Sequence, residues 1–232
     1  IFFDFSRYST TAIGTALCLG FHLPNNFNFP YAAIGFSDFW RRWHISLSTW
    51  LRDYLYIPLG GNQKGRIRTY NNLMITMLLG GLWHGASWTF VVWGGLHGLY
   101  LAVERFLREA IPAQDWFKSL WFKAAMALLT YFLVNITWVF FRAQDFGAAS
   151  LYLASMFAVA PEPKKVLYLN EIIPAAIVIG GMVFTHWRMR DTSMEAVVEK
   201  TPAAVIGLTL TFMLFMLVIT QGSDSAFIYF QF

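Results

Sequence analysis

A run of 35 residues without a formally charged side chain, from Thr69 to Val103, constrains the fold more than any other feature. As one straight α-helix it would measure about 52 Å at 1.5 Å per residue, whereas the hydrocarbon core of a bilayer is about 30 Å thick. The run is therefore too long for a single membrane crossing. It must be broken, and we expect two helices that form a hairpin.

The sequence places the break directly after His84. Gly85 is suited to end a helix and Ser87 to cap the start of the next one. This predicts one helix over residues 72–84 and a second over about 88–107. An ionisable side chain at membrane depth costs about 2.5 kcal/mol or more, and a helix break there requires surrounding protein or a water-filled cavity. We therefore expect His84 to have a polar partner or a chemical role.

The composition of the chain is typical of a membrane protein. It is 57% hydrophobic and only 13% charged, against about 25% charged in soluble domains. Three more segments lack charge and could cross a bilayer: 124–141, 172–187 and 201–223. We predict an all-α, polytopic integral membrane protein with a broken, re-entrant helix pair.

Basic residues predict how the chain is oriented in the membrane. Lys and Arg flank the segments so that 104–123 and 188–200 are expected in the cytoplasm and the C-terminal tail outside it.

The composition also excludes some classes of partner and site. The chain has no basic stripe of the kind that would indicate a nucleic-acid partner. A single cysteine excludes an internal disulfide and a multi-cysteine metal site, and no histidine–carboxylate cluster predicts a metal centre.

A second segment, 37–57, has two distinct faces when drawn as one helix that Ser37 or Asp38 would cap. One face is aromatic and aliphatic. The opposite face carries four polar side chains within an arc of about 80°: Arg41, His44, Ser48 and Arg52. Such a helix suits the wall of a groove, where its arginines could hold a phosphate or a carboxylate.

Five histidines are present, and two of them indicate chemistry more than the others do. Histidine suits proton transfer because its ordinary pKa, about 6.5, lies near neutral pH. His84 lies beside a helix break and His44 lies among cations, so a catalytic, a transport or a packing role stays open for both. His97 lies among glycines, where an interhelical hydrogen bond is the alternative to substrate contact. His22 and His186 are expected to be interfacial.

Two strings of residues are characteristic of a family. FWRRWHISLSTWLRDY, residues 39–54, followed by LGGLWHGA, residues 79–86, resembles the membrane-bound O-acyltransferase family, most closely its alginate O-acetylation branch. Residues 4–9 and the ending 227–232 are similar to that branch as well. The resemblance implies that residues 1–232 are the C-terminal part of a single transmembrane domain whose N-terminal part is missing.

The resemblance also implies a function: transfer of an acetyl group across a bacterial inner membrane for O-acetylation of an exopolysaccharide such as alginate. It implies no bound cofactor, acetyl-CoA as the acyl donor, and an extracytoplasmic acetyltransferase partner. His84 would be catalytic and His44 a second functional position. We expect substrate contacts from five further residues: Arg41, Ser48, Arg52, Trp83 and His97. The alternatives are a D-alanine-transferring relative that acts on teichoic acid and, from another class, a transporter.

Overall fold

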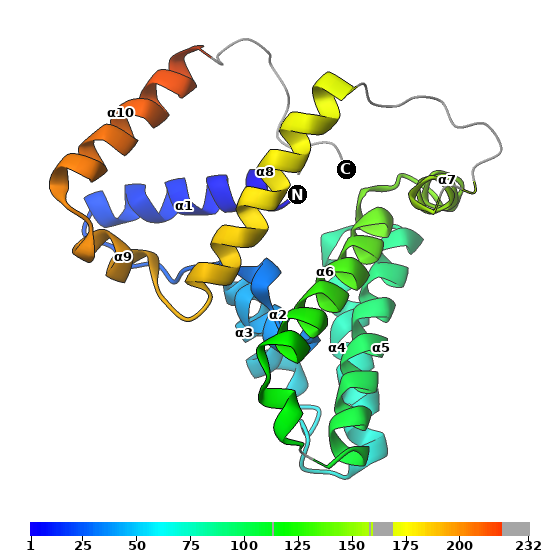
Figure 1. The fold of residues 1–232 in the computed structure, drawn as a ribbon. Helices are drawn as coiled ribbons and strands as arrows, with labels where there is room; N and C mark the ends of the chain where they lie inside the picture. The colour runs from blue at the N-terminus through cyan, green and yellow to red at the C-terminus, as the bar shows by residue number, and fades with distance from the viewer. Residues whose placement is uncertain (113, 158, 160–168, 220–232) are drawn as a thin grey trace.

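The computed structural model describes residues 1–232 except 113, 158, 160–168 and 220–232 (Figure 1). All regular elements in this described part are helical, which confirms the predicted all-α class. The α-helices are α1 (Phe2–Cys18), α2 (Phe36–Arg42), α3 (Ile45–Leu51), α4 (Arg66–His84), α5 (Trp88–Ala110), α6 (Leu120–Arg142), α7 (Phe146–Met156), α8 (Leu169–Met189), α9 (Met194–Lys200) and α10 (Ala203–Ile219). Three short turns are η1 (Pro30–Ala32), the π-helical η2 (Arg52–Tyr56) and η3 (Asp115–Lys118).

The uncharged run forms the predicted hairpin. Helices α4 and α5 pack against each other along their lengths, and α6 lies beside α5 (Figure 1). The Ser87 hydroxyl accepts a hydrogen bond from the Thr89 N–H at 3.3 Å, so Ser87 is the predicted cap of α5. Helix α4 begins six residues earlier than expected, because Gly65 rather than a later residue supplies the turn into it at φ 84°.

Glycines set the close approach of the two hairpin helices. A Cβ atom on Gly81 would lie 2.3 Å from the Phe90 carbonyl oxygen, and one on Gly94 would lie 2.3 Å from the Met77 carbonyl oxygen. Real Cβ atoms do not approach backbone this closely, so a larger residue at either position would push the helices apart. This is the small-residue packing by which helices associate in membranes.

The segment 37–57 is not the single helix that we predicted. It consists of α2, α3 and η2, with a turn at His44, whose φ and ψ of 43° and 56° are left-handed. The turn is held by residues 26–28: the Ile45 N–H donates to the Asn26 carbonyl at 3.0 Å, and the Asn28 N–H donates to the Arg42 carbonyl at 3.0 Å. These bonds replace those that a continuous helix would make.

The predicted caps of this segment are also wrong. Neither Ser37 nor Asp38 caps α2. The Glu104 carboxylate, from α5, accepts hydrogen bonds from the N–H groups of Phe36 and Ser37 instead. Helix α2 is therefore attached at its N-terminus to the second helix of the hairpin.

The core lies between α2, α5 and α6 and is largely aromatic: Phe39, Trp43, Phe90, Trp93, Val134, Trp138 and Phe141 are all buried. Two helices of the described part are long and apolar enough to cross a membrane, α6 and residues 172–189 of α8. Helix α10 is apolar but has only 17 residues, and the predicted span 201–223 ends among residues outside the described ones. The polytopic arrangement stays a prediction.

Candidate functional site

The fold brings His44 and His84 against one tryptophan, Trp83. The ring centroids of His44 and Trp83 are 6.1 Å apart, and those of Trp83 and His84 are 5.0 Å apart. The two motifs, 40 residues apart in sequence, thus meet in one place.

His44 occupies the left-handed turn between α2 and α3. Its ring packs edge-on against Phe5 with centroids 4.6 Å apart, and its Nδ1 lies 3.4 Å from the Ser46 hydroxyl oxygen. A left-handed conformation in a residue other than glycine costs about 1–3 kcal/mol and persists only where the surroundings impose it. Here the hydrogen bonds that Asn26 accepts from the N–H groups of Ile45 and Ser46 impose it, and the imidazole lies against Phe5 of α1 and Trp83.

His84 is the last residue of α4 and is half-buried. Its ring contacts Trp93 of α5 at 5.1 Å and Phe141 of α6 at 5.0 Å between centroids, both edge-on. These rings orient the imidazole without occupying its nitrogens. Among the residues that the structure describes, none makes a hydrogen bond to the His84 imidazole.

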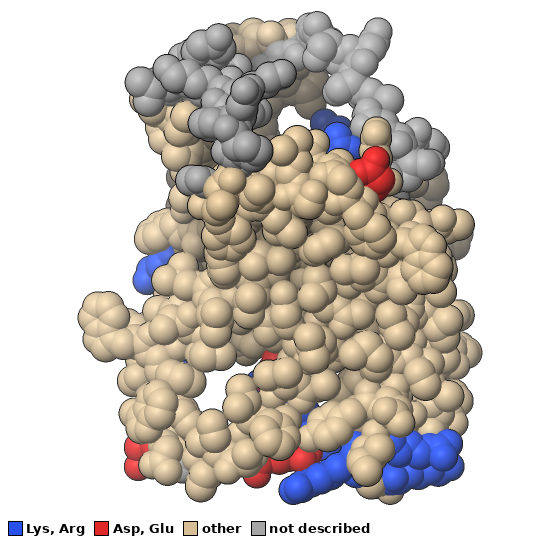
Figure 2. All heavy atoms as spheres, turned by 90° about the vertical axis from the view of Figure 1, so that its right-hand side faces the viewer, with Lys and Arg blue, Asp and Glu red and all other residues tan. Residues whose placement is uncertain are grey.

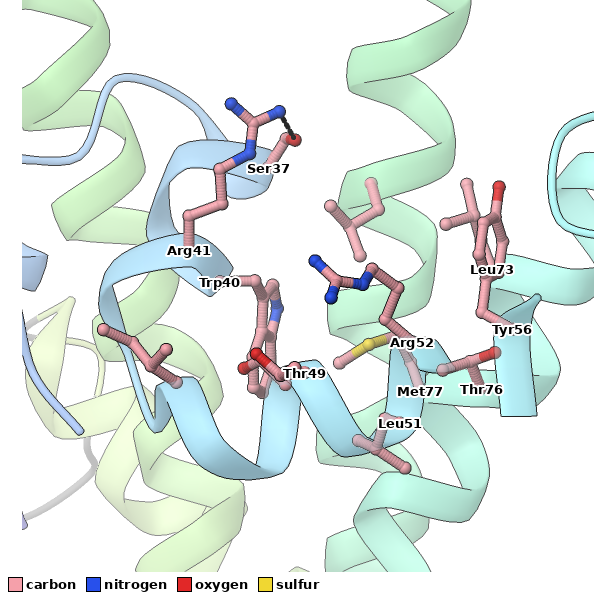
Figure 3. Close-up of a pocket in the computed structure, with 13 residues that line it drawn as sticks. Ser37, Trp40, Arg41, Thr49, Leu51, Arg52, Tyr56, Leu73, Thr76 and Met77 are labelled. Atoms are coloured by element: carbon pink, nitrogen blue, oxygen red, sulfur yellow. Dashed lines mark hydrogen bonds between the residues drawn. The ribbon is translucent and has the colours of Figure 1, made fainter. Parts of the chain in front are cut away.

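A pocket of about 380 Å³ lies between α2, α3, η2 and α4 (Figure 3). Its size falls within the range of small-molecule sites. Three residues of the predicted polar face line it, Arg41, Ser48 and Arg52. They come from α2, α3 and η2 respectively, so the break at His44 turns a helix face into the walls of a pocket.

The two arginines of this pocket are held differently. Arg41 donates to the Ser37 hydroxyl at 3.2 Å (Figure 3), whereas Arg52 donates to both carboxylate oxygens of Asp53, at 2.7 and 3.2 Å. The hydrogen bond from Arg52 lowers the pKa of Asp53 below its ordinary value. Trp40 also lines the pocket, and its buried indole Nε1 has no partner among the described residues. An N–H donor is thus available to an oxygen of a bound molecule.

The pocket lies between the basic end of the hairpin and the histidines. Its α4 wall is formed by Leu73, Thr76 and Met77, which lie midway between the start of α4 and His84. Its α3 wall begins at Ile45, the residue directly after His44. A molecule that enters from the basic end would therefore reach the pocket before it reaches the imidazoles.

His97 does not line the pocket, and its predicted substrate contact stays a prediction. Its side chain is completely buried, and its Nε2 lies 3.0 Å from the Thr137 hydroxyl oxygen on α6. Thr137 donates its only hydroxyl hydrogen to the Val134 carbonyl at 2.7 Å, so the His97 Nε2–H must be the donor to Thr137. This is the interhelical hydrogen bond that we gave as the alternative for His97, and its geometry favours packing over substrate contact.

Two acidic residues hold α2 in place, and the sequence analysis did not predict this role for either. Asp38 accepts from Arg42 at 2.9 Å and from Arg190 at 3.0 Å, which ties α2 to the end of α8. Glu104, which caps α2, also pairs with Arg108 at 2.6 Å. The i,i+4 spacing signals the pairs of Asp38 with Arg42 and of Glu104 with Arg108, but not the bonds to Arg190 or to the start of α2. Within the described residues, no three His, Cys, Asp or Glu side chains gather as metal ligands would.

Comparison with known proteins identifies the relatives of this chain. The chain is 41% identical to the "Probable alginate O-acetylase AlgI" of Pseudomonas putida over 253 residues, which cover 100% of this chain and 51% of that protein. It is 47% identical to the peptidoglycan O-acetyltransferase of Helicobacter pylori over 156 residues, 67% of this chain and 29% of the relative. The teichoic acid D-alanyltransferase of Bacillus subtilis is 29% identical over 154 residues, 63% of this chain and 39% of the relative.

The chain thus spans about half the length of the Pseudomonas relative, and its match covers less than half of the other two. The sequence model of the membrane-bound O-acyltransferase family matches residues 1–143, which is more than half of the chain and includes both histidine motifs, the pocket and α5. This chain belongs to the membrane-bound O-acyltransferase family.

Proposed function

We propose that this chain is part of an enzyme that transfers an acetyl group across the membrane for O-acetylation of an exopolysaccharide such as alginate. One observation carries the proposal: two histidines from separate motifs both contact the Trp83 ring, beside a pocket with two arginines. The names of the Pseudomonas and Helicobacter relatives, an alginate O-acetylase and a peptidoglycan O-acetyltransferase, support acetyl transfer to a glycan.

In this proposal an acyl thioester, with acetyl-CoA as the expected donor, binds in the pocket of about 380 Å³. Arg41 and Arg52 bind its anionic groups, as guanidinium groups bind phosphates. The unpartnered Trp40 Nε1 can donate a hydrogen bond, and the Ser48 hydroxyl, which donates its own hydrogen to the Trp43 carbonyl at 3.0 Å, can accept one. The thioester end then points toward the turn at His44.

His84 acts on the acceptor hydroxyl. An unprotonated imidazole nitrogen takes the hydroxyl proton as the oxygen attacks the acyl carbonyl carbon. The carbon–sulfur bond breaks, the acyl group stays on the oxygen as an ester, and the proton leaves with the thiolate. Transfer of the acyl group first to His84 and then to the hydroxyl is the alternative order. His44 orients the acceptor or stabilises charge on the acyl oxygen, and the Trp83 ring contacts both imidazoles.

We further propose a polytopic protein of the bacterial inner membrane, in which these residues form one domain together with a part outside this chain. Lys and Arg gather at the end where α4 begins and α5 ends (Figure 2), which supports a cytoplasmic location for that end. The donor would then enter from the cytoplasm, and an extracytoplasmic acetyltransferase partner would receive the acetyl group. The C-terminal tail, expected outside the cytoplasm, lies outside the described residues.

The test is His84→Ala in the full-length protein, with polysaccharide acetylation measured in cells at matched protein level. We expect loss of acetylation with normal expression. His22→Ala is the matched control, because His22 is exposed and lies far from the pocket in the loop after α1. Acetylation that is equal in the two variants would overturn the assignment of His84.

A second candidate is transfer of D-alanine, which the similarity to the Bacillus teichoic acid D-alanyltransferase supports at lower identity. The purified full-length protein, given acetyl and D-alanyl thioesters in parallel, would separate the two by which acyl group reaches the acceptor. The transporter alternative has less support, because the family consists of acyltransferases.

A further inference from the structure

A second pocket, of about 820 Å³, lies at the start of α4, away from the histidines. Three basic side chains line it, Lys64, Arg66 and Arg68, together with apolar side chains that include Leu59, Ile67 and Ile75. The pocket belongs to the end of the molecule where Figure 2 shows Lys and Arg gathered below an uncharged surface. Its lining is therefore cationic on one part and apolar on the other.

The basic side chains carry an excess of positive charge. Arg66 pairs with Glu109 at 3.1 Å, but Glu109 also pairs with Arg105 at 2.9 Å. Within the described residues, neither Lys64 nor Arg68 has a carboxylate partner, and Arg68 makes only a 3.4 Å hydrogen bond to the Leu59 carbonyl. The pocket thus favours an anion.

An apolar stripe continues from the pocket along α4. Four exposed apolar side chains lie within an arc of about 120°: Ile67 (78%), Ile75 (41%), Leu79 (44%) and Leu82 (48%). The exposed side chains of Arg68 and Asn71 fall in the same arc at the pocket end, and beyond Ile75 the arc is apolar. From Ile67 to Leu82 the stripe extends about 22 Å at 1.5 Å per residue. A molecule that matches both features has an anionic head and a long hydrocarbon tail.

We propose that this pocket binds the headgroup phosphate of an anionic phospholipid, whose acyl chain lies along the α4 stripe. A soluble phosphate compound would use the cations but leave the stripe bare. Basic pockets at the cytoplasmic face of membrane proteins bind anionic headgroups by the same chemistry. The lipid would hold the lower half of α4 at the membrane surface. This proposal does not depend on the acyl-transfer chemistry proposed above.

The experiment is native mass spectrometry of the full-length protein in detergent, titrated with phosphatidylglycerol or with phosphatidylcholine as the neutral comparison. We expect preferential binding of phosphatidylglycerol. The double variant Lys64→Ala/Arg68→Ala should weaken it about 30-fold, from about 1 kcal/mol per basic residue at 1.4 kcal/mol per tenfold. The control variant Lys118→Ala/Lys123→Ala removes two basic residues outside the pocket and should leave the affinity unchanged.

A further variant tests the tail. Ile67→Asn/Ile75→Asn should weaken phosphatidylglycerol binding while both side chains are exposed enough for the fold to persist. Three results would overturn the proposal: equal binding of the two lipids, an unchanged affinity in the Lys64/Arg68 variant, or displacement of phosphatidylglycerol by an equimolar amount of soluble glycerol phosphate. The last result would assign the pocket to a soluble phosphate ligand.

Discussion

Replacement of Gly94 by alanine should separate the two helices that carry and support His84. The added Cβ would lie 2.3 Å from the Met77 carbonyl oxygen, whereas ordinary contacts begin at 3.4 Å. The helices must therefore move apart by about 1.1 Å at this point, since the atom in the way is backbone and cannot rotate aside. A gap of 0.5–1 Å already forfeits a quarter to a half of the dispersion attraction between the atoms that lose contact.

The magnitude follows from two opposing terms. Overpacking of this kind costs about 1–3 kcal/mol, while alanine in a helix interior is favoured over glycine by about 1 kcal/mol. Gly95 supplies a matched control, because a Cβ there would meet only the Leu78 Cδ2 atom, at 3.6 Å. Gly95→Ala should gain the propensity term without the clash. Because the propensity gain is common to both variants, they should differ by the overpacking cost alone, about 1–3 kcal/mol.

Thermal unfolding of the full-length protein in detergent measures the loss of stability, and we expect a lower midpoint for Gly94→Ala than for Gly95→Ala. The rate of acetyl transfer measures the displacement of His84. A shift of α4 by about 1 Å moves His84 relative to Trp93, and a misplacement of that size can cost about 100-fold in rate. If the two variants unfolded at the same temperature and were equally active, glycine packing would not set the position of His84.

Three further predictions concern the groups around the histidines. His44→Asn should lower acetyl transfer but not the unfolding temperature, because asparagine tolerates the left-handed turn, whereas His44→Val should lower both. Thr137→Val leaves the buried His97 Nε2–H without an acceptor and should destabilise the protein by about 1–3 kcal/mol in chemical unfolding, while Thr137→Ser should be near wild type. Glu104→Gln removes the charge that caps α2 and pairs with Arg108, so both unfolding temperature and transfer should fall, and equal values for wild type and variant would refute this capping role.

The hairpin was predictable because its signals are local. The length of the uncharged run requires a break, and Gly85 and Ser87 supply the residues that end one helix and cap another. The helix limits near the break agree with the prediction. The start of α4 does not agree with the prediction. The helix begins after Gly65, within the basic loop, and the limits of the uncharged run do not indicate where a helix starts inside a charged segment.

The break at His44 was not predictable from the same kind of signal. Residues 37–57 contain no proline or glycine before Pro58, and their hydrophobic pattern fits one helix. The hydrogen bonds that break it come from Asn26 and Asn28, which reach the turn only once the chain has folded back. Local propensity therefore gave the wrong element, and the pocket that results from the break could not be derived from a helical projection.

The two histidines depend on one structural unit, the hairpin. His84 ends its first helix, and Glu104 on its second helix caps α2, whose other end leads into the turn at His44. Thr130 of α6 adds a hydrogen bond from the Gly35 N–H at 2.9 Å, directly before α2. A displacement of α5 would thus move both imidazoles, although neither belongs to α5. This explains why an uncharged run with a histidine at its break also determines the position of a second motif that lies upstream of it.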